Sequence, residues 1–239
     1  MNHEIIIGDC LEVLKKMEDN SFAITVTSPP YNTLPTSGDA GGIHSGNTGI
    51  KNAAMGYEDN KEESHYQEWI NEVVHECLRV SQGLVWINHK PRYREGEAII
   101  PQRFITAPIY CEVIWDRGIS MAMNCKRFAP SYEYIHAFGT PHHWNDHLSK
   151  MMAVWYIQPK RDEKIKHPCP YPIELPLRLI EASSKEGDIV IDPFLGSGTT
   201  SLAAKRLNRK SVGIEQDKEY AELAKNRIEQ DQPLLQGAK

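Results

Sequence analysis

The sequence predicts an α/β fold in which helices cover both faces of a mostly parallel sheet. Two observations lead to this prediction. Short apolar runs rich in β-branched residues alternate with segments of helical periodicity, and Gly or Pro turns follow directly after several of these runs. The chain has 239 residues, 40% of them hydrophobic, which suits one large domain better than two. We therefore expect a single domain over residues 1–239.

The individual elements follow from this alternation. Ile5-Ile6-Ile7 is typical of a strand, and apolar residues at helical spacing over 11–17 predict a short helix after it. A second strand over 23–27 ends at Pro29-Pro30, where neither a helix nor a sheet ladder can continue. By the same reasoning, we expect strands at 83–88, 111–115, 131–138, 188–192 and 211–215, and helices at 66–80, 174–183, 199–207 and 217–228.

Two segments lack this periodicity. Residues 33–60 are rich in Gly, Asn, Ser and Thr, and residues 141–166 are polar and contain several histidines. Long stretches of this kind within a compact domain are typical of binding loops. We interpret both as insertions that recognise a target.

Composition excludes several classes of protein. No apolar run is long enough to cross a bilayer, and the N-terminus lacks the pattern of a signal peptide. The five cysteines are scattered without a C-x-x-C pair, which argues against a disulfide framework or a zinc ribbon and favours the cytoplasm. A net charge of −5 argues against a polycation that coats nucleic acid, although a local basic groove would still allow contact with phosphates.

The strongest local motif is a glycine turn between a predicted strand and a predicted helix, Asp192-Pro193-Phe194-Leu195-Gly196-Ser197-Gly198-Thr199-Thr200. Its glycines let a ligand approach the backbone, and the following helix offers free N–H groups. Glu215, at the end of the next predicted strand, can accept both hydroxyls of a ribose. Ser201 replaces the third glycine of a dinucleotide fingerprint, and Asp192 would attract an ammonium group but repel a pyrophosphate. The turn therefore favours S-adenosylmethionine over NAD.

A second motif, Ser28-Pro29-Pro30-Tyr31, follows the predicted strand at 23–27. It offers a hydroxyl, carbonyls that cannot fold into a helix, and an aromatic face. These groups can cradle a planar heterocycle, with polar acceptors at an exocyclic amine and the Tyr31 ring against the heterocycle. Together with the glycine turn, the motif is a strong signal of a binding site for a planar heterocycle.

The two motifs resemble those of the DNA amino-methyltransferases, which methylate N4 of cytosine or N6 of adenine, and the resemblance covers about residues 4–229. It implies that the catalytic residues are Ser28, Pro29, Pro30 and Tyr31. It also implies a strand lining the target pocket at Ser131-Tyr132-Glu133-Tyr134. The implied donor-binding residues are Asp9, Cys10, His167, Pro168, Asp192, Pro193, Phe194, Gly196, Ser197, Gly198, Thr199, Thr200 and Glu215.

The catalytic motif precedes the donor motif in the chain, an order that resembles the β subgroup of this family. The resemblance implies a circularly permuted, Rossmann-like methyltransferase fold, with a mostly parallel seven-stranded sheet that contains one antiparallel strand. Both loops would then leave the carboxyl ends of adjacent strands, where open α/β sheets place their ligands.

The resemblance implies direct displacement of the methyl group onto a base flipped out of the duplex. Ser28 in the first motif position favours cytosine N4, with adenine N6 as the alternative. A cytosine-C5 enzyme would need a nucleophilic cysteine after a proline, and Cys169 is interpreted as structural instead. An NAD(P)-dependent oxidoreductase and an inactive DNA-binding module are the more distant alternatives.

The expected partner is double-stranded DNA, and the resemblance makes a homodimer and a restriction endonuclease of the same system plausible. Basic residues in three clusters are candidate phosphate contacts: Arg92, Arg94, Lys126, Arg127, Lys160 and Arg161. No metal is expected, because the histidines at 142, 143 and 147 are typical of a solvated loop. No membrane association is expected either.

Overall fold

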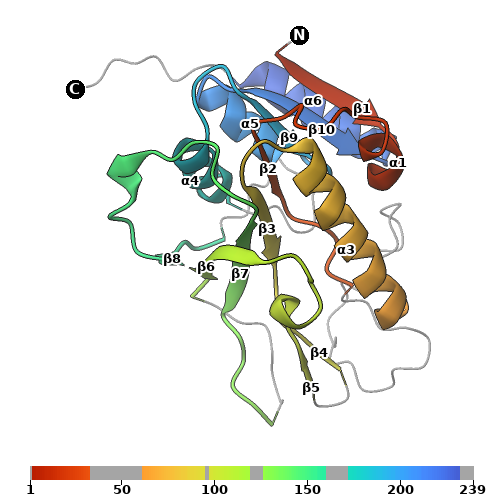
Figure 1. Ribbon diagram of the computed structural model, residues 1–239, viewed down its shortest axis with the longest axis vertical. Helices are drawn as coiled ribbons and strands as arrows, with labels where there is room; N and C mark the ends of the chain where they lie inside the picture. Colours follow the sequence, from red (N-terminus) through yellow and green to blue (C-terminus); the bar gives the residue numbers. More distant parts are fainter. Residues whose placement is uncertain (1, 33–60, 95–96, 119–125, 160–171, 232–239) are drawn as a thin grey trace.

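The chain forms one central sheet of eight strands in the order β1-β10-β9-β2-β3-β7-β6-β8. This computed structural model describes residues 2–32, 61–94, 97–118, 126–159 and 172–231. All neighbouring strands pair in parallel except at β7, which runs antiparallel to both β3 and β6 (Figure 1). In sheet order the strands are β1 (His3–Ile7), β10 (Lys210–Glu215), β9 (Ile189–Asp192), β2 (Ile24–Thr27), β3 (Val85–His89), β7 (Tyr132–Phe138), β6 (Ile109–Asp116) and β8 (Val154–Tyr156).

Helices cover both faces of this sheet. One face packs against α1 (Cys10–Leu14) and α3 (Glu63–Val80), and the other against α4 (Glu174–Ser183) and α5 (Thr199–Arg206). The helix α6 (Lys218–Gln230) packs on α5, β1 and β10. The small elements are a hairpin of β4 (Arg92–Arg94) and β5 (Glu97–Ile99), and two short 3-10 helices, η1 (Pro101–Arg103) and η2 (Asp146–Leu148).

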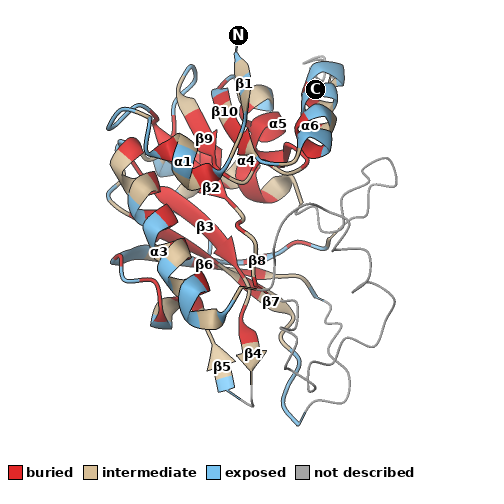
Figure 2. Cartoon of the chain, turned by 90° about the vertical axis from the view of Figure 1, so that its right-hand side faces the viewer, coloured by how far each residue is buried: buried red, intermediate tan, exposed pale blue. Residues whose placement is uncertain are grey.

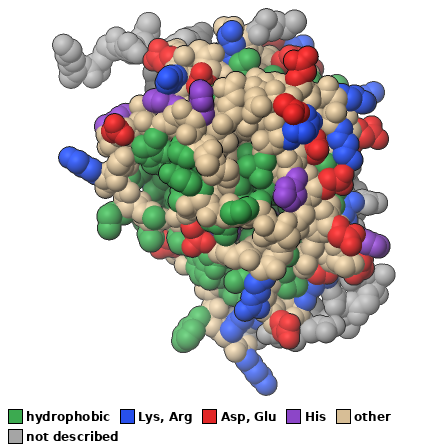
Figure 3. All heavy atoms as spheres, viewed as in Figure 1, with side chains coloured by type: hydrophobic (Ala, Val, Ile, Leu, Met, Phe, Trp, Pro, Cys, Tyr) green, Lys and Arg blue, Asp and Glu red, His purple; other side chains and the backbone are tan. Residues whose placement is uncertain are grey.

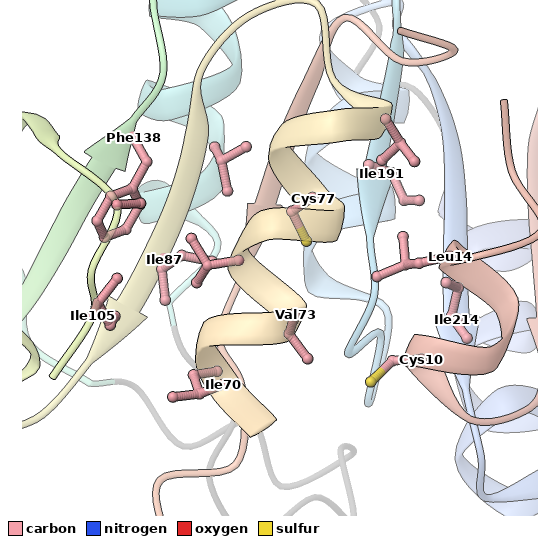
Figure 4. Packing of buried hydrophobic residues seen from close by; sticks show 14 of the residues in the cluster. Cys10, Leu14, Ile70, Val73, Cys77, Ile87, Ile105, Phe138, Ile191 and Ile214 are labelled. Carbon is pink, nitrogen blue, oxygen red and sulfur yellow. The ribbon is translucent and has the colours of Figure 1, made fainter. Parts of the chain in front are cut away.

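The middle strands are buried on both faces, as expected for a parallel sheet between two helix layers (Figure 2). On one face, side chains of α3 such as Val73 and Cys77 pack against Ile87 and Ile191 of the sheet (Figure 4). On the other face, Trp86 lies in the core beside α4 and α5. Successive residues of a strand point to opposite faces, so each buried strand contributes to both cores.

Every strand and helix that the sequence predicts is present, with ends shifted by a few residues. The sheet has eight strands, however, and not the seven that the resemblance implied. The additional strand, β8, lies within residues 141–166, which we expected to be an insertion. Only Trp155 of β8 is buried, while Val154 and Tyr156 are exposed, and so short an alternation gives almost no strand signal.

The described residues bear on two features that composition addressed, membrane-spanning helices and cysteines. Among these residues, no helix is long and apolar enough to cross a membrane. Cys10, Cys77 and Cys111 are free thiols. The expected recognition segment 33–60 lies outside the described residues, as does Cys169.

Candidate active site

The two sequence motifs meet at one rim of the sheet, although they are far apart in the chain. Strands β2 and β9 pair in parallel through Ile24–Val190 and Thr25–Ile191, so both strands end at the same edge. At that edge the Thr27 hydroxyl donates to Asp192 Oδ1 across 2.5 Å. Ser28 follows Thr27 directly, which brings the proline motif beside the glycine turn.

The glycine turn has a backbone that most residues cannot adopt. Gly196 and Gly198 have φ angles of 51° and 80°, in the left-handed region. A Cβ on Gly198 would also lie 2.9 Å from the Cβ of Ala224 on α6. Arg227, from the same helix, donates to the Ser197 carbonyl at 3.0 Å and to Thr199 Oγ1 at 2.9 Å. Helix α6 therefore packs against the turn and holds it in place, a contribution that the sequence did not reveal.

Glu215 lies at the end of β10 with its carboxylate facing the turn. Its Oε2 accepts from the Gly196 N–H at 2.8 Å, and its Oε1 accepts from the Asp217 N–H at 2.9 Å. Each carboxylate oxygen has a further lone pair, so the group can still accept two hydroxyls from a ligand. Burial raises the pKa of Glu215 above the usual range for a glutamate.

Asp9 and Cys10 lie at the same rim because the Gly8 N–H donates to the Glu215 carbonyl at 3.0 Å. The Asp9 carboxylate caps α1 by accepting from the Leu11 and Glu12 N–H groups. The Cys10 thiol is buried, and this burial raises its pKa to about 12. Cys10 is therefore a neutral packing residue and not a nucleophile.

The Asp192 carboxylate is hydrogen-bonded within the protein. Its side chain is only 2% exposed, and it accepts hydrogen bonds from the Thr27 hydroxyl, the Thr200 hydroxyl and the Phe194 N–H. Burial raises its pKa. Because these donors come from β2 and from the turn itself, Asp192 joins the end of β2 to the glycine turn.

The proline motif carries a compact polar network. The Ser28 Oγ lies 2.7 Å from the Tyr31 hydroxyl oxygen and donates to Asn88 Oδ1 at 3.3 Å. The Tyr31 hydroxyl lies within donating distance of Asn88 Oδ1, at 2.7 Å, and of Glu133 Oε2, at 3.1 Å. Arg117 donates to Glu133 Oε1 at 2.7 Å. Strands β2, β3, β7 and β6 or their ends thus all supply a side chain to one site.

Sequence reasoning placed Glu133 in the pocket strand without a role, and it missed Asn88 and Arg117. Their signal was weak but present. Asn88 is a polar residue at the end of the buried run Val85–Ile87, and Glu133 is a carboxylate at an inward position of an alternating strand. Buried polar residues in such places usually have partners, but the sequence does not say which.

The proline motif is also held from the α3 side. The Tyr66 hydroxyl lies 2.8 Å from the Pro30 carbonyl and 2.7 Å from His89 Nε2, while His89 Nδ1 donates to the Lys90 carbonyl at 2.8 Å. Burial lowers the pKa of His89 to about 3, so the ring is neutral and its Nε2 is an acceptor. The Tyr31 ring packs against the His89 ring at a centroid distance of 4.9 Å.

The predicted phosphate contacts separate into three groups. Arg92 does not face DNA: it is 5% exposed, donates to both carboxylate oxygens of Glu63, and lies 4.7 Å from the centre of the Tyr66 ring. Arg94 is half-buried, donating to the Asn32 carbonyl and lying 3.4 Å from Glu63. Lys126 and Arg127 are exposed.

Basic side chains gather at the lower end of the molecule in Figure 3, the end where Figure 1 shows β4 and β5. Arg127 belongs with this hairpin, because its guanidinium lies 4.0 Å from the centre of the Tyr93 ring. Lys160, Arg161, His167 and Pro168 lie outside the described residues. In the parts of the chain that are described, no cluster of His, Cys, Asp or Glu could hold a metal ion, including the histidines at 142, 143 and 147.

Known proteins resemble this chain over nearly its whole length. The chain is 31% identical to the type II methyltransferase M2.DpnII of Streptococcus pneumoniae, covering 94% of this chain and 89% of the relative. It is 30% identical to M2.MboI of Moraxella bovis, covering 98% and 90%.

Solved structures share the fold. The PvuII DNA methyltransferase, described as cytosine-N4-specific, matches with a TM-score of 0.74 and 19% identity over 98% of this chain and 88% of that one. A DNA modification methylase of Thermus thermophilus, solved in complex with S-adenosyl-L-methionine, matches with a TM-score of 0.65 and 25% identity over 95% and 94%. The family model N6_N4_Mtase, described as DNA methylase, matches residues 22–226. The chain therefore belongs to the N6/N4 family of DNA methylases.

Proposed function

We propose that this DNA methylase transfers the methyl group of S-adenosylmethionine to N4 of cytosine in double-stranded DNA. The hydrogen bond between Thr27 and Asp192 is the observation that supports this most directly. It holds the end of the catalytic strand against the start of the glycine turn, so a donor bound at the turn and an amine bound at Ser28 would be neighbours.

The residues at the rim fit the methyl donor. Glu215 retains lone pairs for two ribose hydroxyls, and the glycine turn presents its backbone without side chains. Asp9, Cys10 and Phe194 lie around the same strand ends and would border the adenosine part. When bound, the donor supplies an electrophilic methyl group on a sulfonium. A dinucleotide would place its pyrophosphate near the carboxyl group of Asp192, and Ser201 replaces the third glycine of its fingerprint; both observations argue against the NAD(P) alternative.

The protein has two tasks at the target amine. Ser28 Oγ and the Pro29 carbonyl would accept its two N–H bonds, which favours a pyramidal nitrogen with an exposed lone pair. The Tyr31 ring would stack on the extruded base, and such stacking is worth about 1–3 kcal/mol per base against a flipping cost of a few kcal/mol. Positioning of this kind supplies most of the acceleration and requires no covalent enzyme intermediate.

The choice of cytosine N4 over adenine N6 rests on Ser28. In the resembling family, serine in the first motif position is usual for cytosine enzymes, whereas aspartate or asparagine is usual for adenine enzymes. N6 of adenine is the second candidate, because a hydroxyl accepts a hydrogen bond from either amine. The two named relatives are type II methyltransferases, which supports a role in restriction–modification. From the family resemblance we further propose that the enzyme acts in the cytoplasm, as a homodimer, opposite a restriction endonuclease.

The test is a methyl-transfer assay on mixed-sequence double-stranded DNA with labelled S-adenosylmethionine. Digestion of the product to nucleosides and mass analysis should give N4-methylcytosine, and Ser28→Ala should slow its formation about 10²–10³-fold. N6-methyladenine would instead support the second candidate. Donor binding without any product from the wild-type protein would indicate an inactive DNA-binding module and overturn the proposal.

A further inference from the structure

A chain of charged and polar groups ends at the hydroxyl of Ser28. Arg117 donates to Glu133 Oε1 at 2.7 Å, and Glu133 Oε2 lies 3.1 Å from the Tyr31 hydroxyl. The Tyr31 oxygen in turn lies 2.7 Å from Ser28 Oγ. Asn88 joins the chain from the side, with its Oδ1 2.7 Å from the Tyr31 hydroxyl. Glu133 is 4% exposed, so the pairing takes place largely away from water.

Counting the available hydrogens shows which group donates and which accepts in each hydrogen bond of this network. Glu133 is a carboxylate held by Arg117, and it can only accept. The Asn88 amide is oriented by its Nδ2, which donates to the Tyr134 carbonyl at 3.1 Å, so its Oδ1 is also an acceptor. Among the residues that the structure describes, this network therefore contains two hydroxyl hydrogens, those of Ser28 and Tyr31, and two acceptors that cannot donate. The hydrogen of Tyr31 goes to Glu133, because a bond to a charged acceptor is stronger than one to the neutral amide oxygen of Asn88.

The hydrogen of Ser28 is then also committed to the protein. With the Tyr31 hydrogen directed at the carboxylate, the Tyr31 oxygen becomes an acceptor for Ser28 at 2.7 Å, and Asn88 Oδ1 offers a second acceptor at 3.3 Å. The Ser28 hydrogen is thereby directed into the network, and a lone pair of Oγ is left for the target amine.

The direction of the Ser28 hydrogen matters because a hydroxyl can either donate or accept a hydrogen bond, whereas a carboxylate in the same position could only accept. A free hydroxyl can accept from an amine, or it can donate to the amine nitrogen and occupy the lone pair that must attack. We infer that Glu133, held by Arg117, acts through Tyr31 to keep Ser28 as a hydrogen-bond acceptor. Glu133 is thus a positioning residue, and the inference rests on the proposed role of Ser28.

The ion pair between Arg117 and Glu133 is poorly suited to a purely stabilising role. Among the described residues, the buried Nε of Arg117 has no hydrogen-bond partner. Burying a charge pair costs desolvation, and a pair with an unsatisfied donor offsets less of that cost than a fully bonded one. The second carboxylate oxygen of Glu133 is directed at Tyr31 and not at another cation.

The test compares Glu133→Gln in two backgrounds. In the wild-type background we expect kcat to fall about 10²-fold with the donor Kd unchanged, because the glutamine amide can donate to Tyr31 and reverse the network. In a Ser28→Asp background the same change should alter kcat little, since a carboxylate has no hydrogen to direct. Glu112→Gln is the matched control. Glu112 also bonds a β7 residue, His136, but on the opposite face of the sheet, and its substitution should leave kcat unchanged.

Tyr31→Phe provides a second cycle that does not depend on the activity of Ser28→Asp. Removing this hydroxyl disconnects Glu133 from Ser28, so Glu133→Gln should have no further effect on kcat in Tyr31→Phe. Independent, multiplicative losses in this cycle, or full activity of Glu133→Gln alone, would overturn the inference. Full activity of Ser28→Ala would instead overturn the proposed function itself.

Discussion

The donor half and the target half of the rim are built in different ways. On the proposed donor side, one continuous turn at 192–200 would supply most of the groups, and the bond from the Gly196 N–H to Glu215 helps to hold this turn in place. On the target side, Ser28, Asn88, Glu133 and Arg117 come from four separate parts of the chain and meet through side chains.

The difference has a physical basis. A donor that is the same for every enzyme of this family can be held by backbone geometry, which depends on local glycines and strand ends. An amine that must be made nucleophilic needs hydrogen-bond acceptors in fixed directions, and only packed side chains from several strands provide them. Substitutions on the two sides should therefore affect different kinetic quantities.

The largest effect should come from Ser28→Ala. Loss of one positioned acceptor should lower kcat about 10²–10³-fold, since removal of a single group that stabilises a developing charge has this effect in other enzymes. Donor affinity should not change, because Ser28 belongs to the target half. Single-turnover methylation together with calorimetric titration of the donor measures both quantities, and a parallel loss of donor affinity would contradict the separation of the halves.

Glu215→Gln should show the opposite pattern. In the wild type, backbone N–H groups donate to both oxygens of the Glu215 carboxylate. The glutamine side chain would place its NH₂ group against one of these N–H groups, and its neutral oxygen would accept less strongly from a ribose hydroxyl. We expect donor binding to weaken by about 1.5–3 kcal/mol, the range for hydrogen bonds to charged groups. Asp217→Asn is the matched control, because Asp217 only caps α6 and asparagine caps equally well. A fall in kcat at saturating donor with unchanged Kd would refute the assignment.

The two halves should also respond to acid with opposite sign. The folded-state pKa of His89, about 3, lies below the ordinary value of 6.5 because of burial and the nearby Arg92. Between these values the unfolded chain binds a proton that the folded chain does not. The free energy of unfolding should therefore fall by about 1.4 kcal/mol per pH unit as the pH decreases below 6.5.

Glu215 and Asp192 on the donor side have raised pKa values, so just above the ordinary carboxyl range the folded chain holds the extra proton. Their contribution to the free energy of unfolding increases as the pH falls through that window. Urea unfolding of the wild type and His89→Gln between pH 5 and pH 7 separates the contribution of His89 to the free energy of unfolding from that of the two carboxyl groups. An equally steep acid loss in His89→Gln would show that His89 is not its source.

The smallest effect should come from Arg127→Ala. This exposed residue lies beside the β4–β5 hairpin, at the target end, and one lost phosphate contact should reduce the salt dependence of DNA binding by about one unit of slope. Arg206→Ala is the control, since Arg206 pairs with Asp231 at the end of α5 that lies away from the glycine turn. Equal slopes for the wild type and Arg127→Ala, from binding titrations across several salt concentrations, would remove Arg127 from the DNA surface.

Local patterns were sufficient for most of the fold. Runs such as Ile189–Asp192 and Lys210–Glu215 are strands because their residues suit a sheet buried on both faces. The edge strand β8 escaped prediction because only one of its residues is buried. Arg92 was expected to contact phosphate, but its side chain turns inward to the carboxylate of Glu63, a partner 29 positions earlier in the chain.

The sequence by itself determined the alternation of strands and helices, the glycine turn and the Ser28 motif, because these depend on the conformational preferences of neighbouring residues. Only the tertiary structure decided that Asp192 would join two strands, that Arg227 would support the turn, and that Glu133 would reach Ser28 through Tyr31. Such contacts depend on strand order and on the face to which each side chain points, and no local pattern of residues encodes which distant strands become neighbours.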